Sequence, residues 1–250
     1  MSEENRDEKI RYATHMASLP STYAQDGLVS VHNHEFMNDP AYVAAYARGV
    51  KAAGMNYGWY WRVHIGLWAA SVAKNLRGDF VECGVNAGFM SSSIMHHLEW
   101  NSLDRKFYLL DTFSGLDDRY VTDVEISEGV LEKNTDLIRS GFYITDVTPV
   151  EMNFSEWSNV RIIQGSIPDT LPLVVATEIA FLHIDLNCAP PEIAAVEYFW
   201  EKLVKGAMVL LDDYAYDGYR QQKLAMDVLA KKLGVSIASL PTGQGLFIKP

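Results

Sequence analysis

Three aspartates stand at the ends of two apolar segments, where their carboxylates could bind a cation. Asp185 lies near the end of the segment 179–187, and Asp212 and Asp213 lie near the end of the segment 206–214. Because apolar residues run continuously through each segment, both are predicted to be strands buried on both faces of a parallel sheet.

The residues from Pro191 to Val204 lie between the two strands and have the length and helical period of a crossover. The segments therefore form a βαβ unit in which both strands run the same way. Asp185, Asp212 and Asp213 then arrive at the same edge of the sheet, where open α/β sheets bind their ligands. Carboxylates brought this close repel one another unless a cation or a proton lies between them. Oxygen ligands of this kind suit Mg²⁺ or another hard divalent cation.

A glycine turn earlier in the chain predicts a cofactor site. Gly84 lies where the chain turns after the predicted strand 79–83, and Gly88 lies where the next helix packs closely or a ligand approaches the backbone. Asp111 ends the following strand, and an acid there can accept both ribose hydroxyls. The three-glycine dinucleotide fingerprint and the phosphate loop are missing, which favours a nucleoside without pyrophosphate. S-adenosylmethionine is the commonest such cofactor, and Glu82 could bind its amino group.

These residues must be positioned by an α/β fold. We predict a Rossmann-like, mostly parallel sheet with a C-terminal antiparallel strand pair and an N-terminal helical extension. The extension covers residues 1–77, of which 1–35 are loosely patterned, and the main domain covers 78–250. The expected strands are 79–83, 106–111, 160–164, 179–187, 206–214, 235–240 and 245–249. The expected helices are 41–53, 59–76 (closed by Gly78 as its left-handed cap), 89–100, 146–157, 191–204 and 219–233.

The stretch from Thr112 to Asn159 is longer than a crossover between two strands requires. The helix over 146–157 supplies the crossover. The remainder, at about 112–145, is predicted to be an insertion at the ligand edge of the sheet. Such insertions are usually lids or substrate walls, and a merely solvated loop is the alternative.

Composition restricts the class of protein further. The chain has 250 residues, 48% of them hydrophobic, and a formal charge of −11. That charge argues against nucleic acid or an anionic membrane as the partner. Residues 1–10 have no apolar core and do not resemble a secretory signal, and charged residues interrupt the apolar stretch 59–76. Two cysteines, Cys83 and Cys188, are expected to be buried and unpaired, so we expect a cytoplasmic protein. The apolar N-terminal helices suggest a homodimer, although burial within one chain explains them equally well.

Five motifs together resemble those of the macrocin O-methyltransferase (TylF-like) family. They occur in order from Gly78 to the C-terminus, at 78–85, 108–116, 164–171, 181–185 and 211–214. The resemblance implies a metal-dependent class I S-adenosylmethionine enzyme that methylates sugar hydroxyls, notably on macrolide and aminocoumarin antibiotics. It places Gly165 and Ser166 near the adenine and Mg²⁺ on the three aspartates. The expected cofactor-binding residues are Glu82, Gly84, Val85, Asn86, Gly88, Asp111, Thr112, Phe113, Gly165, Ser166 and Asp185. The expected metal ligands are Asp185, Asp212 and Asp213.

Asn187 departs from the family pattern, in which a second aspartate after Asp185 resembles a general base. An amide does not accept a proton at neutral pH, which leaves three possibilities open. Asn187 orients the hydroxyl while the metal lowers its pKa, or His183 or an insertion residue is the base, or the acceptor differs. We interpret His183 as a buried core histidine, with the base as the alternative.

The predicted function is therefore O-methylation, dependent on S-adenosylmethionine and Mg²⁺. The acceptor would be a hydroxyl of a sugar or of a glycosylated small molecule, either a natural product or a polysaccharide precursor. A catechol-type enzyme acting on an aromatic vicinal diol is an alternative. So is a non-catalytic binder of S-adenosylmethionine or a nucleotide, which Asn187 supports. An NAD-dependent oxidoreductase is disfavoured by the glycine spacing.

Overall fold

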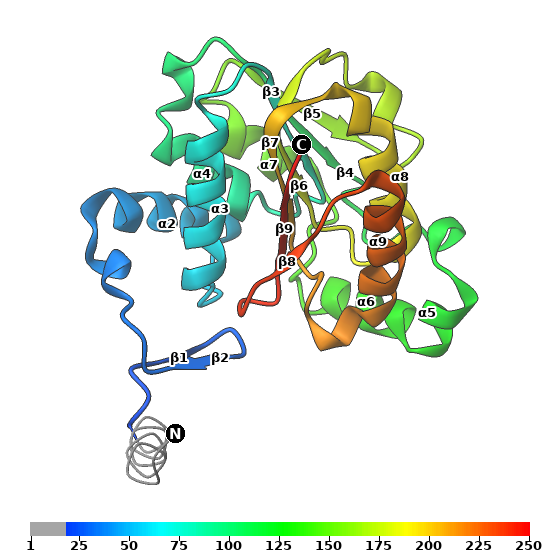
Figure 1. Ribbon diagram of the computed structural model, residues 1–250, viewed down its shortest axis with the longest axis horizontal. Coiled ribbons are helices and arrows are strands. Elements are labelled where there is room, and N and C mark those ends of the chain that lie inside the picture. The colour runs from blue at the N-terminus through cyan, green and yellow to red at the C-terminus, as the bar shows by residue number, and fades with distance from the viewer. Residues whose placement is uncertain (1–18) are drawn as a thin grey trace, which may run out of the picture.

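A seven-stranded sheet forms the centre of the fold in residues 19–250, the part of the chain that the computed structural model describes (Figure 1). Its strand order is β5-β4-β3-β6-β7-β9-β8, with β3 to β7 parallel and β9 antiparallel to both β7 and β8. The predicted fold class is confirmed. The strands are β3 (Asp79–Cys83), β4 (Phe107–Asp111), β5 (Val160–Gln164), β6 (Ile179–Ile184), β7 (Leu203–Leu211), β8 (Ala238–Ser239) and β9 (Gly245–Ile248). The expected strand over 235–240 is thus reduced to two residues.

The two faces of the sheet are covered by different helices (Figure 1). Because side chains alternate along a strand, Phe80 points to one face and its neighbour Val81 points to the other, each into a separate apolar core. The first face packs against α2 (Pro40–Ala53), α3 (Tyr60–Ala73) and α4 (Phe89–His97). The second packs against α8 (Ala189–Phe199) and α9 (Arg220–Leu233). Every residue of β6 is buried, as expected for a central parallel strand.

The register of the parallel strands brings their carboxyl ends into line. Cys83 pairs with Ile184, and Ile184 pairs with Leu211. The next residues along these strands, Asp185 and Asp212, therefore leave the sheet side by side at one edge. This alignment is what the apolar runs predicted.

Helix α3 ends earlier than expected. Its last residue is Ala73 and its cap is Lys74 in right-handed conformation, so the prediction that Gly78 closes this helix is wrong. Gly78 instead precedes β3 with φ of 118°. A β-carbon there would lie 2.9 Å from the backbone of Glu178, so glycine allows the two chain segments to approach.

A small hairpin precedes the helices, in a stretch whose sequence showed no strand pattern. Strands β1 (Tyr23–Gln25) and β2 (Leu28–Ser30) pair antiparallel through a tight turn. Asp26 and Gly27 form the turn with φ of 51° and 70°. Strands of three residues contain too little alternation to be recognised from the sequence. Residues 1–10, from which we inferred that the chain has no secretory signal, lie outside the described part.

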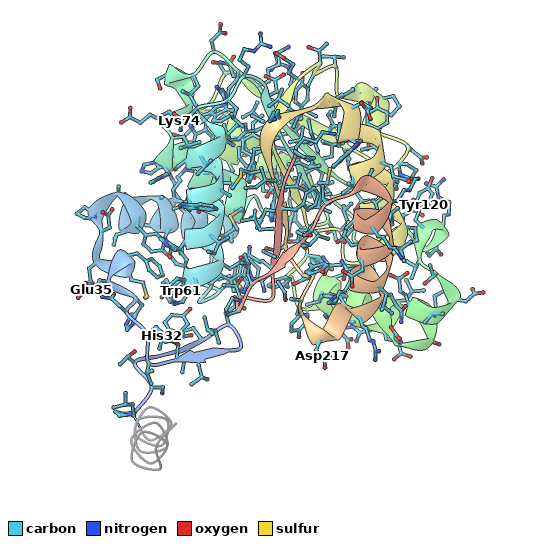
Figure 2. All side chains as sticks on the ribbon, in the orientation of Figure 1. His32, Glu35, Trp61, Lys74, Tyr120 and Asp217 are labelled. Carbon is cyan, nitrogen blue, oxygen red and sulfur yellow. The ribbon has the colours of Figure 1, made fainter. Side chains whose placement is uncertain are left out.

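The insertion contains two helices, α5 (Asp123–Ser127) and α6 (Val130–Arg139). The crossover helix that follows, α7 (Thr148–Phe154), is shorter than expected. The insertion and the hairpin both lie at the lower end of the view in Figure 1, and Figure 2 shows Trp61, in the first turn of α3, at this same end. Among the helices described, none is long and apolar enough to cross a membrane. Cys83 and Cys188 are both buried and unpaired.

Candidate active site

A cavity of about 350 Å³ opens at the carboxyl edge of the sheet. It lies where the strand order reverses between β3 and β6, the usual ligand site of open α/β folds. Residues of the N-terminal segment, the insertion and the loop after β7 complete its wall. Most of the residues predicted from the sequence line it: Glu82, Gly84, Val85, Asn86, Asp111, Thr112, Gly165, Ser166, His183, Asp185, Asn187, Asp212 and Asp213.

The glycine turn is shaped by contacts within the chain. Gly84 has φ of 88°, and a β-carbon there would lie 1.7 Å from the carbonyl oxygen of Asp185. Glycine is thus required for the ends of β3 and β6 to pass each other. At Gly88 a β-carbon would meet the ring of Phe154 at 2.5 Å, which supports close packing of the helix. Gly88 and Phe113 are not part of the cavity wall, and Phe113 lies in the core with 1% of its surface exposed.

Asp111 holds the glycine turn in place. One of its carboxylate oxygens accepts hydrogen bonds from the backbone N–H groups of Val85 (2.7 Å) and Asn86 (2.8 Å). The other accepts from the backbone N–H of Phe113 at 2.7 Å. Asp111 therefore ties two loops of the cavity together. Its predicted contact with a ribose stays a prediction.

His183 is buried between two carboxylates. Its Nδ1 lies 2.8 Å from an oxygen of Glu82, and its Nε2 lies 3.5 Å from Oδ1 of Asp212. Burial lowers the pKa of His183, but the charges of Asp212 and Glu82 and the hydrogen bond to Glu82 outweigh burial and raise the pKa to about 10. A protonated imidazole with both nitrogens directed at carboxylates has no lone pair with which to accept a proton. The geometry supports a paired core histidine, and it also engages Glu82, whose second oxygen accepts from Ser91.

The three predicted aspartates do converge. One oxygen each of Asp185, Asp212 and Asp213 lie within 4.8 Å of one another. Burial, with the charge of Asp212 next, raises the pKa of both Asp185 and Asp213, that of Asp213 to about 6. Burial also acts to raise the pKa of Asp212, but Arg62 and His183 hold it below its usual value. Arg62 and His183 therefore favour the ionised form of Asp212, whereas burial disfavours that form in Asp185 and Asp213.

Arg62 is the functional residue that the sequence analysis missed. Its Nη1 donates to the backbone carbonyl of Asp212 (2.8 Å), to Oδ2 of Asp212 (2.5 Å) and to Oδ1 of Asp213 (3.3 Å). Its Nε donates to Asp26 of the hairpin turn at 3.2 Å, and its Nη2 donates to the carbonyl of Thr242 at 3.2 Å. Only 6% of Arg62 is exposed. In the sequence this arginine is one of the charged residues that interrupt the apolar stretch 59–76.

Asn187 contacts the first aspartate of the cluster. Its Nδ2 donates to Oδ1 of Asp185 at 3.1 Å, and its backbone is left-handed with φ of 58°. The amide thereby orients Asp185. Asn187 is followed by the N-terminus of α8, where the backbone N–H of Ala189 donates to Oε1 of Glu125 at 2.6 Å. Glu125 belongs to the insertion, so the insertion is attached close to Asn187.

The insertion forms a wall of the cavity and is held at further points. The side chain of Asn86 donates to the carbonyl of Phe142 and accepts from the N–H of Ile144, both at 2.9 Å. Ser166 donates to Asp117 at 2.5 Å. The insertion is therefore an anchored part of the cavity wall, and its contact with a substrate stays a prediction.

Comparison with solved structures identifies the class of fold. The O-methyltransferase NovP matches with a TM-score of 0.65 and 19% identity, covering 81% of this chain and 88% of that chain. CalS11, a calicheamicin methyltransferase, matches with a TM-score of 0.51 and 17% identity over 99% of this chain and 93% of that chain. The fold is that of the class I methyltransferases.

Sequence comparison then identifies the family. The model of the macrocin O-methyltransferase (TylF) family matches residues 67–232, and the chain belongs to this family. A tetracenomycin-C 4'-O-methyltransferase of Streptomyces olivaceus, named for its rhamnosyl substrate, is 27% identical over 60% of this chain. The mycinamicin III 3''-O-methyltransferase of Micromonospora griseorubida is 24% identical over 61% of this chain. The matches span 58% and 61% of these two relatives.

Proposed function

We propose that this chain transfers the methyl group of S-adenosylmethionine to a hydroxyl of a sugar-bearing small molecule. The observation that carries the proposal is a single cavity that joins the glycine turn to the carboxylate cluster, in a member of the TylF family. One curated relative is named for a rhamnosyl-bearing tetracenomycin and the other for mycinamicin III, and the first of these names supports a glycosylated acceptor.

The residues of this chain divide the work of binding and positioning. The turn at Gly84, held by Asp111, shapes the cofactor side of the cavity. The insertion and the aromatic side chains of Tyr57, Trp59 and Phe142 bound the cavity and restrict the entry of water. Holding the two reactants in line is itself a large source of rate in a direct displacement.

The carboxylate cluster is suited to a divalent cation. Carboxylate oxygens are the ligands that Mg²⁺ prefers, and Asp185 and Asp213 each retain an oxygen to which no group in residues 19–250 donates. When bound, such an ion acts as a Lewis acid that lowers the pKa of a coordinated hydroxyl. Asn187 would then orient Asp185 and would not need to take a proton. His183, already paired, is a poor candidate for the base.

A transfer assay tests the proposal. Purified chain is incubated with S-adenosylmethionine carrying a labelled methyl group and with a panel of rhamnosylated polyketides, and product is followed by mass spectrometry. We expect methylated glycoside, inhibition by excess EDTA, and a loss of about 100-fold or more in kcat for Asp213→Asn. Full activity in EDTA would remove the metal from the proposal.

A catechol-type reaction is the second candidate, because the aromatic rings around the cavity suit a flat acceptor. Tyr57, Trp59 and Phe142 pack together, with Tyr57 4.4 Å from Trp59 and 5.1 Å from Phe142 between ring centroids. Including catechols in the acceptor panel separates the two candidates. Transfer to catechols with none to glycosides would replace the sugar by an aromatic diol. Binding of the cofactor with no transfer to any acceptor would favour a non-catalytic binder.

A further inference from the structure

The carboxylate cluster already contains a cation that belongs to the protein. The guanidinium of Arg62 contacts Asp212 at 2.5 Å and Asp213 at 3.3 Å, and both partners are largely buried. Buried pairs are weakly screened by solvent, so this charge strongly affects any other cation that approaches.

Arg62 and its neighbours use both oxygens of Asp212. Arg62 takes Oδ2, whereas Oδ1 accepts from Nε2 of Gln244 at 3.0 Å and faces Nε2 of His183 at 3.5 Å. By contrast, among residues 19–250 Oδ1 of Asp185 receives only the amide of Asn187, and Asp213 receives only the more distant contact from Arg62. Asp212 is thus the member of the cluster least available to a metal.

We propose that Arg62 is a built-in counter-cation that reserves Asp212 and weakens the affinity of the cluster for divalent ions. A divalent ion then relies on Asp185 and Asp213 for its carboxylate ligands. This inference rests on the proposed function only in taking the cluster to be the ion's site. It assigns Arg62 a positioning role, because this residue acts through Asp212.

The hairpin fixes Arg62 in this position. Asp26, in the hairpin turn, accepts from Nε of Arg62 at 3.2 Å, while the carbonyl of Thr242 accepts from Nη2 on another side. The guanidinium is therefore held from three elements and cannot swing away without breaking several buried hydrogen bonds. Weak ion binding is then a fixed property of the folded chain.

The test is a Mn²⁺ titration of the full chain, without cofactor or acceptor, in which electron paramagnetic resonance measures the free ion. Arg62→Met and Arg62→Gln remove the charge, and the glutamine retains a donor for the carbonyl of Asp212. Arg62→Lys keeps the charge. We expect the two neutral variants to bind Mn²⁺ tighter than wild type by about tenfold or more, and the lysine variant to stay within about threefold.

Arg48→Met is the matched control. Arg48 is equally buried and bonds to Glu156 and Asn153. The Arg48→Met variant also loses a buried arginine, but its affinity for Mn²⁺ should not change. Thermal melts with and without Mn²⁺ give a second readout, in which the ion should raise the Tm of Arg62→Gln more than that of wild type.

The inference is overturned if neither neutral variant binds Mn²⁺ more tightly than wild type, including the case in which no variant binds the ion. Equal gains in Arg48→Met and Arg62→Met would overturn it too, because the effect would not be specific to the cluster. These results are independent of the transfer assay. If the wild-type chain methylates glycosides but Arg62→Gln gains no affinity for Mn²⁺, only the inference is refuted. If no methyl transfer occurs, only the proposed function is refuted.

Discussion

Replacing Glu125 by alanine should release the insertion from the rest of the domain. Glu125 is buried, and its Oε1 accepts from the backbone N–H of Ala189 at 2.6 Å. Its Oε2 accepts from the backbone N–H of Thr122 at 2.9 Å and from the hydroxyl of Thr122 at 2.7 Å. One side chain thus closes the capping box of α5 and satisfies a donor at the N-terminus of α8.

The expected loss of stability in Glu125→Ala follows from these three contacts. A hydrogen bond to a charged group contributes about 1.5–3 kcal/mol, and leaving the buried N–H of Ala189 without an acceptor costs about 1–3 kcal/mol. Because the contacts share one side chain they are not additive, and we expect Glu125→Ala to destabilise the insertion by about 3–4 kcal/mol. Glu125→Gln keeps one acceptor oxygen and should cost roughly half as much.

Limited proteolysis measures this effect directly. Cleavage within residues 112–145 should accelerate strongly in Glu125→Ala, while the acceptor KM rises and affinity for S-adenosylhomocysteine changes little. Glu128→Ala is the control, since Glu128 follows α5 directly and bonds to Gln221 at the surface. Proteolysis of Glu125→Ala at the rate of wild type would refute the view that this carboxylate anchors the insertion.

Two further substitutions test the packing of the site and its charge. Gly84→Ala places a β-carbon 1.7 Å from the carbonyl of Asp185 at a φ of 88°, so chemical denaturation should show a loss of stability of at least about 3 kcal/mol. The control Gly141→Ala, whose β-carbon would meet no atom of residues 19–250 within 4 Å, should lose about 1 kcal/mol. Equal losses would contradict the required close approach. Burial raises the pKa of Glu192 from 4.5 to about 8 despite a hydrogen bond from Gln222. The stability that this proton-binding group contributes to the folded state is therefore present below pH 4.5 and is lost as the pH rises to about 8. Near pH 5 the Tm of Glu192→Gln should therefore equal that of wild type, whereas at pH 8 the variant should be more stable by up to about 4 kcal/mol. An equal dependence of Tm on pH in both proteins would exclude the shifted pKa.

The central strands could be predicted because their signal is local. The segment 160–164 matches β5 at both ends. The apolar runs located β6 and β7, although both strands end before the expected residues 187 and 214, and β7 begins at Leu203 instead of residue 206. Once the strands are parallel, their polar end residues must meet, so Asp185 and Asp212 were placed together correctly.

The partners of single side chains could not be predicted in the same way. Asp111 ends a strand, as expected, but its three backbone donors depend on how two loops fold over its carboxylate. Asn187 has a left-handed backbone that no spacing rule reveals. The short strands of the hairpin could not be predicted either, because three residues are too few to show an alternating pattern.

Arg62 shows how far sequence reasoning could have gone. An arginine in an apolar helix must find an acceptor, because a buried unpaired charge is costly. The residues three and four positions away in the sequence, Gly58, Trp59, Ile65 and Gly66, carry no acid, so the acceptor had to come from elsewhere in the chain. At the same time, three aspartates were predicted at the sheet edge, and no basic residue had been assigned to them. The sequence therefore contained both halves of the ion pair, and only the docking of α3 against the sheet joins them. A surplus of buried acids at one predicted sheet edge is thus evidence for a buried basic residue elsewhere in the chain as well as for a metal.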